Sequence, residues 1–424
     1  MTDYTWDGGG DGTSWNDADN WGGSDYPRTN NDKATINVGS ASISMDIPGG
    51  TGVVGEVYLG SGFTGTVTQA YGFTIDSAGS ENGQLEINNA SATWDTNSAA
   101  LTVDSHISGN GTLTVGASTI TCSGQTTCGT VNISTGTYNY YDDFRPGTAN
   151  ITDNAIINQT SIGGQFGGRI IITASKTPTF NAIGRLNSTL DIRTGEQGNS
   201  TFNLDLSEDW SGGPARHVFF YNLELDSQDT ENNTYTMQGA ITCTGDLTIT
   251  DGEIDTGSDH ALTVNGDIDV DGTLTANAST LTFGGHSRID GTFARGTSTV
   301  IMDGNQGSVT NPTIRSFVGD NKFYNLICRD TATGDGVQMA TDITVANDLT
   351  IENTASLTGY IADRVLTVEG DVVIAGIFRG NRYGTGAANS FGSLTINAGD
   401  GSTTGVFQAS SGTTTVSGDM VSNG

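Results

Sequence analysis

The sequence predicts an all-β protein built as a parallel β-helix (β-solenoid), and three observations support this fold class. Short segments in which Val, Ile, Leu, Phe or Thr alternate with polar residues recur about every 8–12 residues, between corners rich in Gly and Asn. No segment shows the i, i+3, i+4, i+7 apolar spacing of an amphipathic helix over three turns. The sequence also repeats itself: ALTVNGDIDVDGTLTANASTLTF at Ala261–Phe283 matches ALTVDSHISGNGTLTVGASTITC at Ala100–Cys122. Internal repetition of this kind indicates a stack of similar coils.

The spacing of corner residues favours coils of about 20 residues. Asp246 and Asp267 are 21 residues apart, and Gly272 and Gly291 are 19 apart. In Gly245–Ile249 the two-residue alternation turns the Leu and Ile side chains inward and the Thr side chain to water. The alternative is a row of tandem β-sandwich domains, one for each array of about 100 residues. Near-identical strand units within one array favour the solenoid, because a sandwich does not need them.

The chain divides into five predicted parts. Phe-Tyr-Asn-Leu occurs at 220–223 and again at 323–326, which places two related arrays one after the other. An earlier array precedes them, separated by a less regular stretch. The expected parts are an N-terminal cap segment (1–50), a first β array (51–141), an irregular junction or insertion (142–217), a second β array (218–321) and a third β array (322–424).

The composition limits the partners. Hydrophobic residues make up 34% of the chain, which raises disorder as an alternative, but the regular alternation argues against it. The formal net charge of −31 excludes nucleic acid and anionic membranes as partners, because both need clustered Lys and Arg. No apolar run is long enough to span a membrane. The acidity either keeps a strand-rich surface soluble or holds divalent cations, and both explanations stay open.

The first 50 residues predict a cap. Trp6, Trp15 and Trp21 lie in a Gly- and Asp-rich segment, and we expect them to cover the first core layer of the repeat body. The Asp residues of this segment allow Ca²⁺ as a cofactor, although turn formation explains them more simply. They are Asp7, Asp11, Asp17 and Asp19.

The repeats resemble those of known surface proteins. The motifs are F-Y-N-L at Phe220–Leu223, G-D-L-T-I at Gly245–Ile249, L-T-V-x-G-D at Leu262–Asp267 and G-T-L at Gly272–Leu274. They resemble the strand repeats of bacterial surface proteins and phage fibre proteins, and the Trp/Gly-rich start resembles autotransporter passenger regions. The resemblance implies a β-helix with an adhesive or structural role, and a homo-oligomer for which a trimer is plausible.

The search for catalytic residues leads to no assignment. A glycan depolymerase on a β-helix needs two carboxylates a few ångströms apart. The best local clusters are Asp205, Glu208 and Asp209 beside Trp210 and His217, and the acids of 251–260 and 266–272. In so acidic a chain such neighbours arise by chance, so we expect solvated surface. His106 aligns with Asp267 at a corner and is expected to be exposed. No catalytic, cofactor-binding or metal-binding residue is assigned.

The four cysteines are expected to be free and buried. Cys122 aligns with Phe283, Cys328 with Leu225 and Cys243 with Val345, so other repeats fill these positions with core residues. Cys122 and Cys128 are close enough in sequence to pair, but four thiols in this length do not make a disulfide framework.

Three functions are compatible with these observations. The first is a non-enzymatic structural protein of a tailed phage virion, such as a fibre, spike or decoration component, located on the virion surface. It is favoured by the acidic repeat body, the free cysteines and a start at Met1 without a visible leader. Its partners are other virion proteins or copies of itself, with a cell-surface glycan as a further candidate. The second is a secreted bacterial adhesin or surface-layer protein, extracellular or on the cell surface; the third is a glycan depolymerase. Function is expected in the cap, in 142–217 or in the 379–391 insertion.

Overall fold

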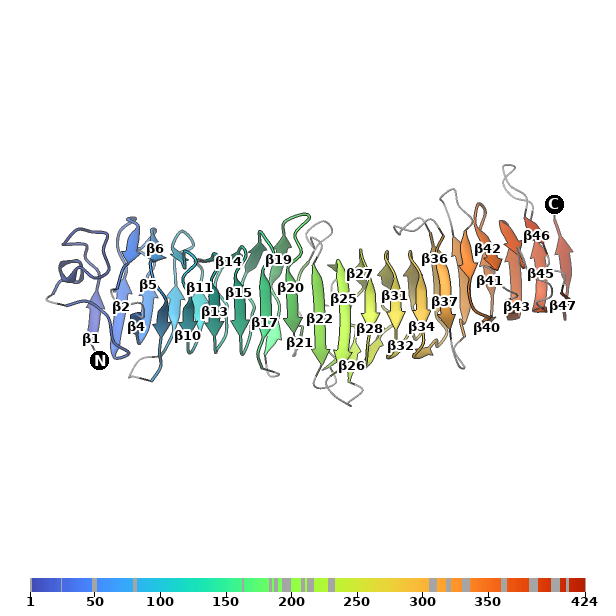
Figure 1. Ribbon diagram of the computed structural model, residues 1–424, viewed down its shortest axis with the longest axis horizontal. Coiled ribbons are helices and arrows are strands. Elements are labelled where there is room, and N and C mark those ends of the chain that lie inside the picture. Colours follow the sequence, from blue (N-terminus) through green and yellow to red (C-terminus); the bar gives the residue numbers. More distant parts are fainter. Residues whose placement is uncertain are drawn as a thin grey trace. The chain divides into compact units, whose positions relative to one another are not determined.

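The computed structural model describes most of the chain (Figure 1). The described residues are 2–23, 25–47, 52–78, 82–161, 164–182, 185–186, 190–192, 200–206, 210–211, 217–227, 233–304, 311–317, 322–329, 336–359, 364–380, 388–397, 405–408 and 412–423. The fold separates into two compact units, which are described one by one. Unit 1 is Met1–Ser207 with Gly212–Pro214, and unit 2 is Glu208–Ser211 with Ala215–Gly424.

Unit 1 is a β-solenoid of three parallel sheets. Most coils contribute one strand to each sheet, but between β11 and β18 the first sheet continues only as single bridges at Thr126 and Phe144. Sheet 1A contains β1 (Thr2–Thr5), β2 (Asp32–Ile36), β5 (Glu56–Leu59), β8 (Leu85–Ile87) and β11 (Ile107–Gly109), with β18 (Gln165–Phe166) and β21 (Arg185–Leu186) further along. Sheet 1B contains β3 (Ile43–Met45), β6 (Thr66–Gln69), β9 (Thr93–Asp95), β12 (Thr112–Val115), β14 (Thr130–Ile133), β16 (Thr148–Ile151) and β19 (Arg169–Ile172). Sheet 1C contains β4 (Gly52–Val54), β7 (Phe73–Ile75), β10 (Leu101–Val103), β13 (Thr119–Cys122), β15 (Thr137–Tyr140), β17 (Ile156–Gln159), β20 (Thr179–Ala182) and β22 (Thr201–Leu206).

Unit 2 is built in the same way. Sheet 2A contains β23 (Trp210–Ser211), β26 (Thr234–Thr236), β29 (Glu253–Asp255), β32 (Thr273–Thr275) and β35 (Thr292–Ala294). Sheet 2B contains β24 (Val218–Phe220), β27 (Ile241–Cys243), β30 (Leu262–Val264), β33 (Thr280–Phe283), β36 (Thr299–Asp303), β38 (Asn325–Arg329), β41 (Leu349–Ile351), β43 (Leu366–Ile374), β45 (Asn389–Ile396) and β48 (Met420–Ser422). Sheet 2C contains β25 (Asn222–Ser227), β28 (Leu247–Ile249), β31 (Ile268–Val270), β34 (Ser287–Ile289), β37 (Thr313–Phe317), β39 (Val337–Met339), β42 (Ser356–Gly359), β44 (Ile377–Arg379) and β46 (Val406–Gln408). β40 (Ile343–Val345) and β47 (Thr414–Val416) pair with the first halves of β43 and β45.

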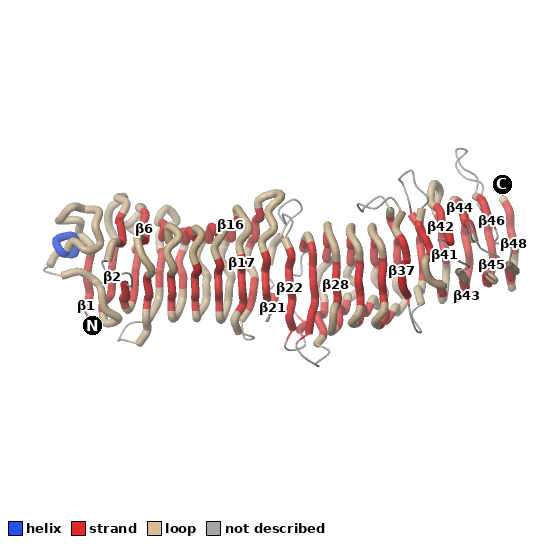
Figure 2. The backbone as a smooth tube through the Cα atoms, in the orientation of Figure 1, coloured by secondary structure: helices blue, strands red, loops and turns tan. Residues whose placement is uncertain are grey.

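Parallel pairing in register confirms the predicted fold class. Thr112 of β12 lies beside Thr93 of β9 and Thr130 of β14, so like residues stack on consecutive coils. Leu113, the next residue along β12, is fully buried, as the alternation predicts. Figure 2 shows strands and corners alternating, with the 3-10 helix η1 (Ala18–Trp21) as the helix among the described residues. The tandem β-sandwich alternative is wrong, because a sandwich is antiparallel and the pairings of the described strands are parallel.

The sequence repeat does not correspond to a whole number of coils. The segment LTI forms β28 in sheet 2C, but its copy 102 residues later forms β41 in sheet 2B. Leu262–Val264 is the whole of β30 in sheet 2B, whereas its copy Leu366–Val368 is only the first part of the longer strand β43, the part that pairs with β40. The repeating element is therefore one strand with its corner. One sequence can serve on different faces because each face needs inward apolar residues and a tight corner.

The core of unit 1 contains stacked aromatic rings. Phe144 and Phe166 stack with ring centroids 5.5 Å apart, and Phe180 and Phe202 stack at 4.8 Å. The region 142–217, expected to be a junction or insertion, contributes β16, β17, β19, β20 and β22 to sheets 1B and 1C.

The prediction of free, buried cysteines is confirmed for Cys122, Cys128, Cys243 and Cys328. Burial raises the pKa of the Cys128 thiol to about 12.

Candidate functional site

The tryptophans of the opening segment form one buried cluster. Trp15 is fully buried, and its ring lies against Trp21 at 4.8 Å and Phe73 at 6.2 Å between centroids. Trp6 contacts Trp21 from the other side at 5.1 Å. The indole N–H of Trp15 donates to the carbonyl of Pro27 at 3.0 Å, and that of Trp21 donates to the carbonyl of Trp15 at 2.7 Å. The cluster therefore packs against Phe73 of sheet 1C, with the indole N–H groups of Trp15 and Trp21 both hydrogen-bonded.

The polar side chains of this cap hold its loop together. Asn20 is fully buried; its Oδ1 accepts the N–H groups of Gly10 and Gly12, and its Nδ2 donates to Asp11 Oδ1 at 2.8 Å. Asp11 also accepts hydrogen bonds from Ser14 and Thr13, and these bonds, led by the Ser14 hydroxyl, hold the pKa of Asp11 well below its usual range.

The acids proposed as calcium ligands are engaged in the same way. Asp7 accepts the N–H of Gly9, and Asp17 accepts the N–H groups of Asp11 and Asp19. Within the described part of the chain no group of three or more His, Cys, Asp or Glu residues has a geometry that could hold a metal ion. The cap carboxylates thus act as turn acceptors.

A second set of carboxylates lies at the corner that precedes sheet 2C. Asn222 Oδ1 accepts the N–H of Asp246 at 2.8 Å, Asp246 Oδ1 accepts that of Asp267 at 2.8 Å, and Asp267 Oδ1 accepts that of His286 at 2.8 Å. The imidazole Nδ1 of His286 then accepts the N–H of Thr313 at 3.2 Å. We call these four side chains, on successive coils, the corner acceptor column: Asn222, Asp246, Asp267 and His286.

The column explains the Gly-Asp pair of the repeats. A Cβ on Gly266 would lie 2.2 Å from Asp246 Oδ1, and a Cβ on Gly245 would lie 2.2 Å from Asn222 Oδ1. Glycine is therefore needed where the acceptor of one coil approaches the next. The same contact occurs in unit 1, where His106 Nδ1 accepts the N–H of Gln125 at 2.9 Å and a Cβ on Gly124 would lie 2.5 Å from this nitrogen.

The predicted corner position of His106 is confirmed, and the side chain is exposed. The sequence did not reveal why Asp267 of the second array aligns with His106 of the first. Asp, Asn and neutral His share an acceptor atom at a similar reach from the backbone, and this property is retained while charge is not. A related column, Asn325, Asp348 and Asp371, supports β41 and β43.

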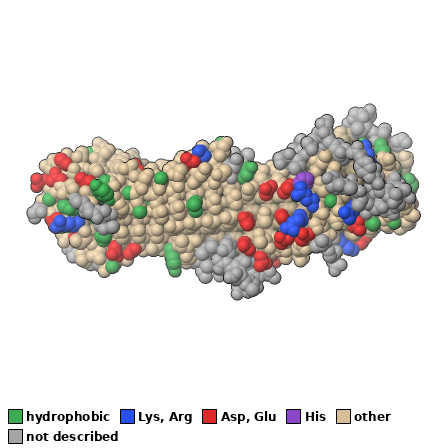
Figure 3. Space-filling view, viewed as in Figure 1, with side chains coloured by type: hydrophobic (Ala, Val, Ile, Leu, Met, Phe, Trp, Pro, Cys, Tyr) green, Lys and Arg blue, Asp and Glu red, His purple; other side chains and the backbone are tan. Residues whose placement is uncertain are grey.

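The outward acids of 266–272 surround one arginine. Arg288 of β34 contacts Asp269 at 2.6 Å and Asp271 at 2.8 Å on the preceding coil, and Asp290 at 2.5 Å on its own coil. The Ser316 hydroxyl also donates to Asp290, and with Arg288 it lowers the pKa of that carboxyl. Figure 3 shows acidic, basic and His side chains gathered on one part of this face. These acids share the single guanidinium of Arg288, and their ion pairs and hydrogen bonds connect adjacent coils.

The acids of 251–260 also bridge coils. Glu253 accepts the hydroxyl groups of Thr234 at 3.0 Å and Thr275 at 2.5 Å. Asp255 accepts the Asn277 amide at 2.6 Å, and Asp259 accepts the N–H of Ala278 at 2.9 Å. A general acid or base needs a carboxyl group facing bound substrate, and these groups face neighbouring coils instead.

The proposed depolymerase cluster is described only at His217. The side chains of Asp205, Glu208, Asp209 and Trp210 lie outside the described residues. His217 stacks on Phe219 at 4.3 Å and its Nε2 makes a hydrogen bond of 2.8 Å with the Thr242 hydroxyl. Burial lowers the pKa of His217, which favours the neutral imidazole.

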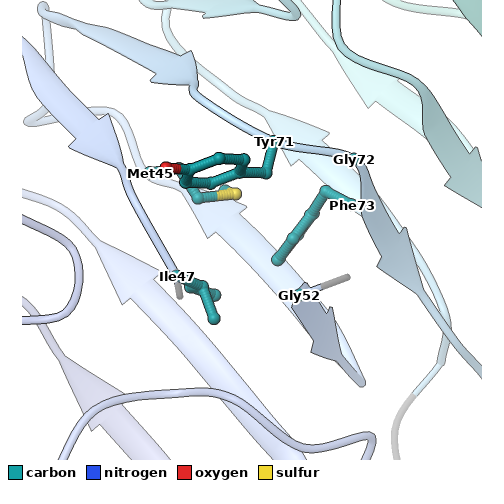
Figure 4. Close-up of a pocket in the computed structure, with 6 residues that line it drawn as sticks. All are labelled: Met45, Ile47, Gly52, Tyr71, Gly72 and Phe73. Carbon is teal, nitrogen blue, oxygen red and sulfur yellow. The ribbon is translucent and has the colours of Figure 1, made fainter. Parts of the chain in front are cut away.

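A small pocket lies where β3 and β4 meet the start of β7 (Figure 4). It is open to solvent, leaves no room for a water-sized molecule, and is lined by Met45, Ile47, Gly52, Tyr71, Gly72 and Phe73. This space is below the roughly 300–1,000 Å³ of typical small-molecule sites. Among the described residues that line it, Tyr71, half exposed, is the titratable one, and none of them carries a carboxylate or an imidazole.

Outward amides form ladders on unit 1. The Nδ2 atoms of Asn158, Asn181 and Asn203 each donate to Oδ1 of the Asn on the preceding coil at 2.8–3.0 Å, starting from Asn139. Asn132 and Asn150 make the same contact on sheet 1B at 2.8 Å. On both units, some outward side chains thus tie one coil to the next.

Comparison with protein-family models, with curated proteins and with solved structures finds no match for this chain. Among the residues that the structure describes, no helix has the length and apolar character needed to cross a membrane.

Proposed function

We propose that this chain is a non-enzymatic structural protein of a tailed phage virion, a fibre, spike or decoration component whose β-solenoid is exposed on the particle. The observation that carries the proposal is the use made of its polar surface. Acceptor columns, amide ladders and the Arg288 cluster all connect consecutive coils. Surface contacts of this kind stabilise the solenoid itself.

The cysteines favour the virion over a secreted adhesin. All four thiols are buried and unpaired. Proteins that fold in oxidising compartments commonly pair their thiols, whereas virion proteins fold and assemble in the reducing host cytoplasm. The free thiols therefore agree with assembly inside the cell.

Charge supports a role on the outside of a particle. A net charge of −31 disfavours contact with packaged nucleic acid and leaves a soluble outer surface. Partners of this chain are then other virion proteins or further copies of itself, which meet through its uncharged parts.

The proposal is tested by immunogold electron microscopy with antibodies against the recombinant protein. Particles and cell envelopes from the source culture are labelled in parallel, with pre-immune serum as the control. Gold at a fixed position on intact tailed particles supports the proposal. Gold on cell envelopes without label on particles overturns it and favours the adhesin. Release of reducing ends from capsule or lipopolysaccharide by the purified protein would show the depolymerase instead.

A further inference from the structure

We propose that the contact between β34 and β37 is a pH-sensitive joint, in which the neutral imidazole of His286 holds the backbone of Thr313 and protonation releases it. His286 Nδ1 accepts the Thr313 N–H at 3.2 Å, and this bond joins the first residue of β37 to the preceding coil. The proposal concerns this joint in the isolated protein and does not depend on the proposed function.

The joint needs the neutral form of the side chain. A backbone N–H is only a donor, so Nδ1 must present its lone pair. When the ring is protonated both nitrogens carry hydrogen, and Nδ1–H then faces Thr313 N–H. At the equivalent corners of the column the acceptors are Asn222, Asp246 and Asp267, and an amide or carboxyl side chain keeps an acceptor oxygen whether or not it is protonated. His286 is the member of the column that titrates in this range.

The pairing of β34 with β37 is also irregular in its register. Its register shifts between Ser287 and Arg288, where Ser287 lies beside Ile314 but Arg288 lies beside Ser316. The buried Ser287 hydroxyl oxygen makes no hydrogen bond. The other pairs of β34, with β31, are in regular register. The Thr313 bond therefore lies next to a strand pairing that is already interrupted.

Charged groups from both neighbouring coils face the imidazole. Asp267, on the preceding coil, accepts the His286 N–H, and its charge favours protonation. Arg315, on β37, opposes protonation and lies 3.9 Å from Asp267 Oδ2. The nearby acids Asp269, Asp271 and Asp290 are paired with Arg288. Burial outweighs the attraction of Asp267, so the pKa of His286 lies below its usual value.

The sign of the pH effect follows from that direction. A histidine with a lowered folded-state pKa contributes stability above the unfolded pKa of about 6.5, and loses it as pH falls below that value. At about pH 5.5 the opened form gains up to roughly tenfold in population over the closed form relative to neutral pH, which is the ceiling set by protonation of the free imidazole.

Hydrogen–deuterium exchange of the full chain tests the joint. Peptides covering 311–317 are compared at about pH 7.5 and about pH 5.5, after correction for intrinsic exchange rates, and we expect a several-fold loss of protection at the lower pH, within the tenfold ceiling. Peptides covering β12 and β14, which contain no titrating acceptor, serve as the internal reference.

Two variants separate the joint from a general acid effect. His286→Asn supplies the acceptor that Asn222 supplies to Asp246, so protection of 311–317 should stay high and become independent of pH. Asp267→Asn keeps an acceptor for the His286 N–H but removes the negative charge, so the folded-state pKa of His286 should fall further. The loss of protection should then begin at the same pH but continue to lower pH than in the wild type. Unchanged protection in the wild type at the lower pH overturns the proposal, as does pH dependence that persists in His286→Asn.

Discussion

His106 and Asp267 make the same contact in different units. The imidazole Nδ1 of His106 accepts the N–H of Gln125 at 2.9 Å, and Asp267 Oδ1 accepts the N–H of His286 at 2.8 Å. The two residues occupy equivalent places in the repeat, 161 positions apart. A substitution that looks like a loss of charge is therefore the exchange of one acceptor for another.

The acceptor at position 267 is expected to matter more than its charge. Asp267→Ala leaves the His286 N–H without its partner and should lower the free energy of unfolding by about 1–2 kcal/mol. Asp267→Asn keeps an acceptor and should cost less than about 0.5 kcal/mol at neutral pH. Urea denaturation of both variants measures the difference. Equal losses for Ala and Asn would contradict the acceptor role.

The close approach at Gly266 predicts a steric penalty. A Cβ there would lie 2.2 Å from Asp246 Oδ1 and 2.6 Å from the backbone of Gly245, so Gly266→Ala should destabilise unit 2 by about 2–4 kcal/mol. Gly23→Ala is the matched control, because its nearest neighbour would be the Trp21 carbonyl at 3.8 Å. Thermal unfolding should show a lower midpoint for the first variant alone.

The sequence was enough to predict the strands and their inward-facing residues. It was not enough to predict which of the three sheets each strand joins. Alternation identifies Leu247 and Ile249 as core residues wherever their strand lies. The sheet that a strand joins depends on the accumulated length of the corners before it. For this reason β28 and β41, nearly identical in sequence, belong to sheets 2C and 2B.

The hydrogen bonds between coils could not be predicted from the sequence either. The acceptors and donors of the corner acceptor column are 19–27 residues apart, and the separation changes from coil to coil. Without the register no pattern connects His286 to Thr313. The sequence correctly indicated that the acids of the repeat vary, but not that each keeps an acceptor.

Phe166 is expected to be among the most sensitive core positions of unit 1. Its ring contacts Phe144, Tyr140, Phe180 and Phe202 with centroids 5.2–6.2 Å apart, and the side chain is buried. Phe166→Ala removes these contacts and should cost about 3–5 kcal/mol. The outward Thr148→Ala, measured by the same denaturant titration, should stay within about 0.5 kcal/mol of the wild type. A small effect at Phe166 would mean that neighbouring rings refill the space.

The free thiols should be inert in the folded protein. Burial raises the pKa of Cys128 to about 12 and also raises the pKa of Cys122, so neither thiolate is populated at about pH 8. Iodoacetamide should therefore label the protein only after denaturation, as measured by mass spectrometry. Reducing agent should leave the unfolding midpoint unchanged, because no disulfide is present. Rapid labelling of native protein at Cys128 would contradict its burial.

Acid should release the tryptophan cap through Asp11. Hydrogen bonds from Ser14, Thr13 and Asn20 hold the pKa of Asp11 below its unfolded value of 3.8, so its contribution is complete above that value and is lost as pH falls below it. The buried Trp15 and Trp21 report on this step through their fluorescence, which should shift to longer wavelength as the cap opens. Asp11→Asn keeps one acceptor oxygen for the N–H groups of Thr13 and Ser14, but places an NH2 group where Asp11 accepts the Ser14 hydroxyl. Its cap should therefore be weaker at neutral pH but less sensitive to acid. If the fluorescence of both proteins shifts over the same pH range, groups other than Asp11 control the opening.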